Sequence, residues 1–403
     1  MKAFYYIISL ITVSLLVLLF EETGIFVLNN AIFSGLLILL FSYVVYRIDY
    51  RIDENAKQGK RELSNLDVVK YLCSILIILC HLRPFVHYDE VIDMFFNNIV
   101  TRIGVPCFFV MTGYLVSLKE KENPAYIDKY TKRTIPMYLL WSVIYLPFLG
   151  LLAYENMDVV QQYMEIFHVN IFLLPLAIIP ALFVLLFYSG AYYHLWYFPA
   201  LLCALWVMKK WKKRFRPVSL LVIAFVLLIF GATETYYGIF PEFVQTVLQK
   251  YYYGIFFTTR NFLFFGLFYV TLGYAMGYYN REHTKHSLCG LLVSIGLLAL
   301  EAVFLHSTNR LNSNIMFACI PTSYFLVSAA LYMKQYFHIP FPYRAFSKYY
   351  YLLHPMVMVI AFSLGLYAET SDPFIQIAWI LILTHLLSIL VIRIAKWFPK
   401  LPL

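Results

Sequence analysis

The sequence has little charge and no long polar segment. Only 13% of its 403 residues are Asp, Glu, Lys or Arg, whereas 62% are hydrophobic. That apolar share exceeds the share found in ordinary soluble domains, and the mean hydropathy of +0.73 agrees with it. Apolar runs of about 17 to 25 residues, each long enough to cross a bilayer as a helix, recur along the chain. A soluble fold is therefore excluded, and the sequence predicts an integral membrane protein.

Sequence motifs for metals and nucleotides are also missing. The six cysteines lie within or beside apolar runs and show no paired metal-ligand spacing, so we expect them to be reduced packing residues. Neither a P-loop nor a dinucleotide-binding fingerprint occurs. We therefore expect no metal and no permanently bound cofactor.

The net charge of +9 comes from basic residues that gather in short segments. The densest segment is KKWKKRFRP, residues 209–217, which holds six Lys or Arg. Short basic loops mark the cytoplasmic side of a multi-pass protein, and an aromatic residue beside them is typical of the membrane interface. The charge therefore favours the lipid bilayer as a partner and argues against nucleic acid.

The same rule predicts the topology. An N-terminal hairpin (1–60) precedes a membrane domain (61–403). The stretch 168–190 is apolar, but a crossing there would carry the 209–216 charges outside. Because it contains two prolines, which break backbone hydrogen bonds, we interpret it as re-entrant or interfacial. With both termini cytoplasmic, the predicted spans lie near 4–20 and 26–46 in the hairpin, and near 66–86, 96–117, 135–153, 195–208, 218–233, 261–279, 287–305, 313–333, 349–367 and 375–397 in the domain.

Two ionisable residues lie inside the first span of the membrane domain. Lys70 and His81 are separated by eleven positions, so a helix places them on one face about 16 Å apart along its axis. Asp67, one turn before Lys70, lies close to the same face. Ionisable residues inside a span usually face an internal cavity or pathway. Alternatively, Lys70 could extend to the interface, and His81 could be a hydrogen-bonded packing residue.

Other polar residues lie near span ends, and each has a structural alternative. Arg102 could anchor lipid headgroups, while Thr112 and Gly113 behind it allow close helix contact. His354 could be a satisfied core histidine. The remaining candidates are His194, Trp196 and Tyr197, which could form an aromatic belt, together with Arg260, Asn261 and Glu301 near the outer side.

Six stretches, in this order, resemble the membrane acyltransferases of the acyltransferase type 3 class. They are SNLDVVKYLCSILIILCH, RIGVPCFFVMTGYL, YIDKYTKRTIPMYLLWSVIYLP, YYHLWYFPALL, FGLFYVTLGYAMG and YYYLLHPM. The class has ten spans, as does the predicted domain. This chain departs from the usual pattern in having Lys70 for Arg, Thr112 for Ser and two lysines in the cytoplasmic loop. The stretch YYHLWYFPALL is also similar to the membrane half of serine and alanine racemases.

The resemblance implies an O-acyltransferase of the bacterial cytoplasmic membrane. Acyl-CoA, with acetyl-CoA expected, would be the cytosolic donor, and a hydroxyl of a cell-envelope glycan or related molecule would be the acceptor. His81 would act as general base or transient acyl carrier, with Asp67 and Lys70 beside it. The donor would meet Lys70, Lys129, Lys132 and Arg133. The acceptor or developing oxyanion would meet Arg102, His194, Trp196, Tyr197, Arg260, Asn261 and Glu301.

A transporter or flippase is the alternative function. In that case Lys70, His81 and Glu301 would form a proton or substrate pathway through the bundle. Activity on acyl-CoA without a membrane barrier distinguishes the two. The acyl group, the acceptor, the choice between direct transfer and relay, and the oligomeric state stay open at this stage.

Overall fold

The structure is a computed structural model. It describes residues 63–158, 161, 182–249, 256, 258–280, 286–306, 308, 310, 312–332, 341–368, 372–399 and 401–402. The predicted hairpin at 1–60 lies outside the described residues, as does most of the stretch 168–190. Both therefore stay predictions.

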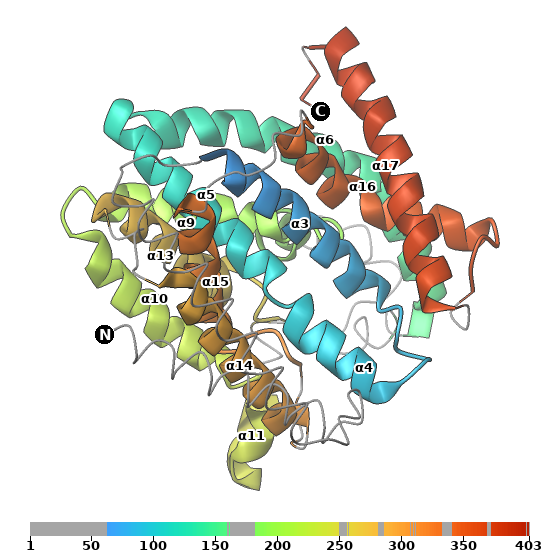
Figure 1. Cartoon of the computed structure of the whole chain (residues 1–403), viewed down its shortest axis with the longest axis horizontal. Coiled ribbons are helices and arrows are strands. Elements are labelled where there is room, and N and C mark those ends of the chain that lie inside the picture. Colours follow the sequence, from blue (N-terminus) through green and yellow to red (C-terminus); the bar gives the residue numbers. More distant parts are fainter. Residues whose placement is uncertain are drawn as a thin grey trace, which may run out of the picture.

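The described residues form helices and no strand, as predicted (Figure 1). Three short π-helical segments, η1, η2 and η5, occur among them. The elements are α3 (Leu63–Leu82), α4 (Glu90–Phe95), η1 (Phe96–Val100), α5 (Gly104–Glu122), α6 (Tyr126–Glu155), η2 (Leu185–Ser189), α9 (Tyr197–Trp211), α10 (Pro217–Ala232), η3 (Tyr237–Ile239), α11 (Glu242–Val247), η5 (Phe262–Gly266), α13 (Leu267–Tyr278), α14 (Ser287–His306), α15 (Cys319–Tyr332), α16 (Tyr343–Ser363) and α17 (Pro373–Trp397).

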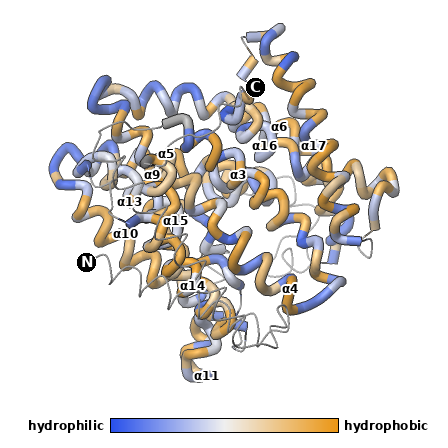
Figure 2. Tube along the Cα trace, viewed as in Figure 1, coloured by the Kyte–Doolittle hydropathy of each residue, from blue (hydrophilic) through white to orange (hydrophobic). Residues whose placement is uncertain are grey.

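Within the described residues, five helical segments are long and apolar enough to cross a membrane. They are Asn65–Leu82, Glu90–Glu122, Tyr126–Glu155, Ser287–His306 and Pro373–Trp397, and shorter apolar helices occupy Pro217–Ala232, Phe262–Tyr278 and Cys319–Leu331. The chain is thus an all-helical protein with several membrane-spanning candidates, while the total of ten core spans stays a prediction. In Figure 2 hydrophobic residues run along most helices, and hydrophilic residues gather toward many helix ends.

Helices α5 and α13 pack backbone against backbone. A Cβ added to Gly113 would lie 2.1 Å from the carbonyl oxygen of Val270, and one added to Gly273 would lie 1.9 Å from that of Val110. Each helix therefore needs a glycine where the other approaches. The close contact predicted at Gly113 is confirmed.

Three helix ends meet at one end of the bundle, which we call the basic face: the end of α5, the start of α6 and the end of α9. Lys209 lies 2.5 Å from Asp128 of α6, and Lys212 pairs with Glu120 of α5. The basic run at 209–216 therefore lies on the same side as the loop between α5 and α6, as the charge rule predicted. We call the other end of the bundle the opposite end.

Candidate active site

Three histidines from separate parts of the chain lie together in the bundle. The ring of His81, in the last turn of α3, stacks on that of His354 in α16, with centroids 5.3 Å apart. His194, just before α9, meets His354 edge-on at 5.4 Å. Helices α3 and α16 pack on each other. His81 lies eleven residues after Lys70, and His354 lies eleven residues after Tyr343, and both starting residues are at the basic face. At 1.5 Å per residue this places both rings about 16 Å into the bundle.

The three rings differ in their hydrogen bonds and exposure. His354 is fully buried, and its Nδ1 donates to the carbonyl oxygens of Tyr350 and Tyr351 at 3.0 and 2.9 Å. Its Nε2, and both ring nitrogens of buried His194, have no hydrogen-bond partner among the described residues. His81 is half-buried. The cluster thus holds buried polar nitrogens without a partner among the described residues, and His81 is the ring that a bound molecule reaches most easily.

A large cavity opens at the basic face. Its volume is about 1430 Å³, and the predicted donor residues Lys70, Lys129 and Arg133 line it together with Asp67. The fourth predicted donor residue, Lys132, is exposed on α6 but does not line the cavity. Lys70 therefore faces an internal space, as predicted from its position on α3.

Three more cations line this cavity, and the sequence analysis did not name them as donor residues. They are Arg344 and Lys348 from the start of α16 and Lys396 from the end of α17. The signal that could have found them is the short spacing from Lys348 to His354 in SKYYYLLHPM. Those residues lie less than two turns apart. A helix that places His354 in the site therefore also places Lys348 at the mouth of the cavity.

An aromatic layer separates the cavity from the histidines. Phe108, Tyr197 and Tyr351 line the deep end of the cavity, and their ring centroids lie 5.8 to 6.2 Å from one another. The hydroxyl of Tyr197 lies 3.1 Å from that of Thr112, and the hydroxyl of Tyr351 donates to the carbonyl oxygen of His194. The cavity also reaches Ile77, one turn before His81. Its deep end is therefore one layer of side chains away from the histidine cluster.

The predicted acceptor residues fall into two groups. His194 belongs to the histidine cluster and Tyr197 to the aromatic layer, while Arg102 and Arg260 lie close enough for their charges to act on His81. Trp196, Asn261 and Glu301 hold the fold together instead, as described next. Their role toward an acceptor stays a prediction.

Structural contacts take up the polar groups of Asn261 and Glu301. The side-chain oxygen of Asn261 accepts from the backbone N–H of Phe264, and its amide donates to the hydroxyl of Tyr188 and the carbonyl oxygen of Thr258, each at 2.7 Å. The carboxylate of Glu301 accepts from the backbone N–H groups of residues 317 and 318, at 2.7 and 2.8 Å, and from the hydroxyl of Tyr236. Trp196 packs against Phe109 and Phe265.

The chain belongs to a known family, because residues 63–393 match the family model described as Acyltransferase domain. It is thus a membrane acyltransferase by family, as the sequence motifs predicted. No solved structure matches it.

Several curated proteins are similar to the chain. Two amino-acid racemases of Enterococcus faecalis are 26% and 24% identical, over 55% and 76% of this chain and 29% and 43% of their own length. A serine/alanine racemase of Enterococcus gallinarum is 25% identical over 72% of this chain and 40% of its own length. The chain spans less than half the length of these relatives.

Proposed function

We propose that the chain is an O-acyltransferase that takes acyl-CoA, with acetyl-CoA expected, from the cytosol at the basic face. It transfers the acyl group to a hydroxyl of a cell-envelope acceptor, such as a glycan, at the opposite end. The observation that carries this proposal is the course of the cavity: it starts among six cations and ends one aromatic layer below the histidine cluster.

The cavity fits the chemistry of the donor. CoA carries several phosphate charges at one end of a long flexible arm and the thioester at the other. Arg133, Arg344 and Lys348 supply charge and hydrogen-bond donors to the phosphates at the mouth. The apolar and aromatic walls deeper in the cavity suit the arm. The thioester then comes to lie at the aromatic layer, below His81.

Transfer needs a base beside the thioester carbonyl. His81 takes the proton of the acceptor hydroxyl while that oxygen attacks the carbonyl carbon. The tetrahedral intermediate collapses, the carbon–sulfur bond breaks, and the CoA thiolate takes the proton back from His81. His354, whose Nδ1 is held by two carbonyl groups, keeps its unprotonated Nε2 inside the cluster and packs the ring of His81 in place. In a relay, His81 would instead carry the acyl group transiently on its ring nitrogen.

The test is release of CoA by purified protein in a detergent without hydroxyl groups. Acetyl-CoA and a panel of methyl glycosides are added, free CoA is followed with a thiol reagent, and the ester is identified by mass spectrometry. We expect ester formation by the wild-type protein and a loss of about a hundredfold or more in His81→Ala, since base catalysis contributes roughly 10²- to 10⁴-fold.

The matched control is His306→Ala, a histidine on the exposed end of α14 whose side chain is 40% exposed. It should leave the rate unchanged. If His81→Ala inserts normally and still transfers acetyl at the wild-type rate, His81 is not the base. If no acceptor yields ester but liposomes take up an unmodified glycan, the chain is a transporter.

A further inference from the structure

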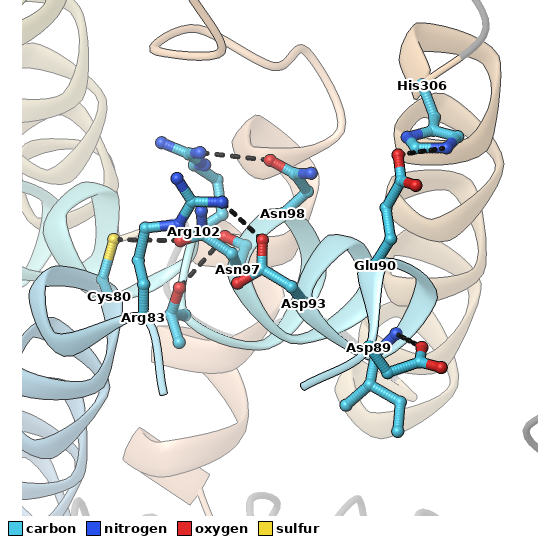
Figure 3. A network of polar contacts seen from close by, with 11 residues as sticks. Cys80, Arg83, Asp89, Glu90, Asp93, Asn97, Asn98, Arg102 and His306 are labelled. Carbon is cyan, nitrogen blue, oxygen red and sulfur yellow. Dashed lines mark hydrogen bonds and ion pairs between the residues drawn. The ribbon is translucent and has the colours of Figure 1, made fainter. Parts of the chain in front are cut away.

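The start of α5 lies beside the end of α3, so Arg102 is close to His81. The thiol of Cys80, next to His81, lies 3.6 Å from the side-chain oxygen of Asn97. A Cβ added to Gly104 would lie 3.2 Å from the side chain of Ile77, one turn before His81. In the sequence, Arg102 lies between Asn97 and Gly104, the two residues that make these contacts. Its guanidinium donates to Asn98 at 3.2 Å, as Figure 3 shows.

Two further arginines reach the same place from loops. Arg310, after α14, donates to the carbonyl oxygen of Leu305 at 2.5 Å. Leu305 packs in one apolar cluster with Ile99 and Ile103, the second of which is the neighbour of Arg102. Arg310 therefore lies on the side of α14 that faces the start of α5.

Arg260, before η5, is tied to the loop that holds Arg310. The side-chain amide of Asn314 donates to the hydroxyl of Thr259 at 3.1 Å, and both bind the carboxylate of buried Glu234. Burial lowers the pKa of the Arg260 guanidinium, and the charge of Arg102 lowers it further. Burial and then Arg102 lower the pKa of Arg310 in the same way. The guanidinium groups of Arg102 and Arg260 thus lie near His81, and that of Arg310 lies near Arg102.

The positive charge of this cluster is poorly balanced within the described part of the chain. None of the three arginines forms an ion pair there, although the charge of Glu234 acts on Arg260. Glu234 accepts hydrogen bonds from Thr259 and Asn314, and the Glu301 carboxylate is similarly occupied. The Nε of Arg102 is buried and has no partner among the described residues. Like charges in a poorly solvated place repel, so a bound anion would stabilise this arrangement.

We propose that Arg102, Arg260 and Arg310 form an anion subsite for the acceptor, which is therefore a hydroxyl compound that carries a carboxylate or a phosphate. This inference rests on the proposed function for its hydroxyl chemistry. Guanidinium groups bind carboxylate and phosphate through paired hydrogen bonds, and three of them from separate segments define a fixed position. An anion held there places a neighbouring hydroxyl of the same molecule at His81, on the side away from the donor cavity.

The arginines could instead stabilise the oxyanion of the tetrahedral intermediate. The two roles predict different results. An oxyanion site acts on every acceptor, whereas an anion subsite acts only on acceptors that carry the anion. Matched acceptors therefore separate them.

The experiment compares methyl glucuronide with methyl glucoside, which differ in a carboxylate, and glycerol phosphate with glycerol. Purified full-length protein in hydroxyl-free detergent is given saturating acetyl-CoA, and kcat/KM is measured for each acceptor. We expect the kcat/KM of at least one anionic acceptor to exceed that of its neutral partner by about tenfold or more, which is the effect of one charged hydrogen bond. In Arg310→Gln, that preference, taken as the ratio of the two kcat/KM values, should fall to about one.

Arg83→Gln is the matched control, because Arg83 is an arginine of the same end that is already paired with Asp93 at 2.5 Å (Figure 3). It should keep the preference, and Arg310→Lys should restore part of it. Equal loss on both members of a pair in Arg310→Gln, or no preference in the wild-type protein, would overturn the subsite.

A binding measurement separates this proposal from the proposed function. The melting temperature of the wild-type protein and of Arg310→Gln is measured with methyl glucuronide, glycerol phosphate and their neutral partners. A rise with an anionic compound in the wild-type protein alone supports the subsite even if no ester forms, in which case only the transferase proposal fails. No rise with any anion, at concentrations well above those of the kinetic assay, contradicts the subsite.

Discussion

The two ends of the bundle carry positive charge in different ways. At the basic face, cations on long side chains surround a cavity of about 1430 Å³. At the opposite end, three half-buried arginines come from separate segments. Arg102 donates to Asn98, Arg310 donates to the carbonyl oxygen of Leu305, and the loop of Arg260 is held by the bond between Thr259 and Asn314. Solvated lysines and arginines around a large space suit a large anion that enters and leaves. Fixed guanidinium groups suit a single small anionic group that must be oriented.

The histidine cluster lies between these two regions, and the glycine contact of α5 with α13 keeps them aligned. Arg102 lies just before the start of helix α5, and Thr112 of the cavity lies in the middle of that helix. A shift of this helix would therefore disturb both ends at once. A change to a cavity residue should disturb only the basic face, and a change to one of the three arginines should disturb only the opposite end.

The largest effect is expected for Gly273→Ala. The added methyl group would lie 1.9 Å from the carbonyl oxygen of Val110, so the helices must separate. Such overpacking costs about 3 kcal/mol, and both donor and acceptor binding should be lost. Thermal melting in detergent with size-exclusion chromatography measures this. Gly150→Ala, where a Cβ meets nothing within 4 Å, is the control and should melt at or above the wild-type temperature.

A tenfold effect on one substrate is expected at the cavity. Arg344→Gln removes a cation from the mouth, so the KM for acetyl-CoA should rise about tenfold, the size of a lost charged hydrogen bond. The KM for the acceptor should stay the same. Lys132→Gln, at an exposed α6 lysine that does not line the cavity, is the matched control. Equal increases of this KM in Arg344→Gln and Lys132→Gln would show that the residues lining the cavity are not the ones that contact the donor.

A smaller effect is expected in the aromatic layer. Thr112→Val removes the hydroxyl that lies 3.1 Å from that of Tyr197, with little change in shape. A lost neutral hydrogen bond costs about 1 kcal/mol, so kcat should fall roughly fivefold while the KM for acetyl-CoA changes little. Steady-state kinetics at varied donor concentration measures both. An unchanged kcat would exclude this contact from the reaction.

The assignment of the basic face to the cytosol can be tested without kinetics. Single cysteines at Lys213 and Glu369 are introduced into a background without the six native cysteines. Intact cells are treated with a membrane-impermeant thiol reagent. We expect labelling of Glu369→Cys and none of Lys213→Cys. Labelling of Lys213→Cys would mean that the segment 168–190 crosses the membrane and that the basic face lies outside.

Much of the fold could be predicted from the sequence, because hydrophobic length and loop charge act locally. The position of α3, the close contact at Gly113 and the shared side of the 209–216 cluster with the loop between α5 and α6 follow from these rules. Lys70 lines the cavity, as expected of an ionisable residue inside a span.

The long-range contacts of the site could not be predicted in this way. His194 and His354 join His81 only because α16 packs on α3 and the segment before α9 packs on both, and single-sequence spacing carries no such information. Glu301 has the features of a site residue in sequence. In the fold it binds the N–H groups just before α15, which are distant in the chain. Arg310 lies in a loop without a motif.

The most direct test of this account is an electron cryomicroscopy structure of the protein with a non-hydrolysable acetyl-CoA analogue. The account predicts density for the phosphates among Arg133, Arg344 and Lys348, and density for the acyl end at the aromatic layer below His81. Density for the nucleotide at the opposite end, beside Arg310, would contradict the account, as would an empty cavity at saturating analogue.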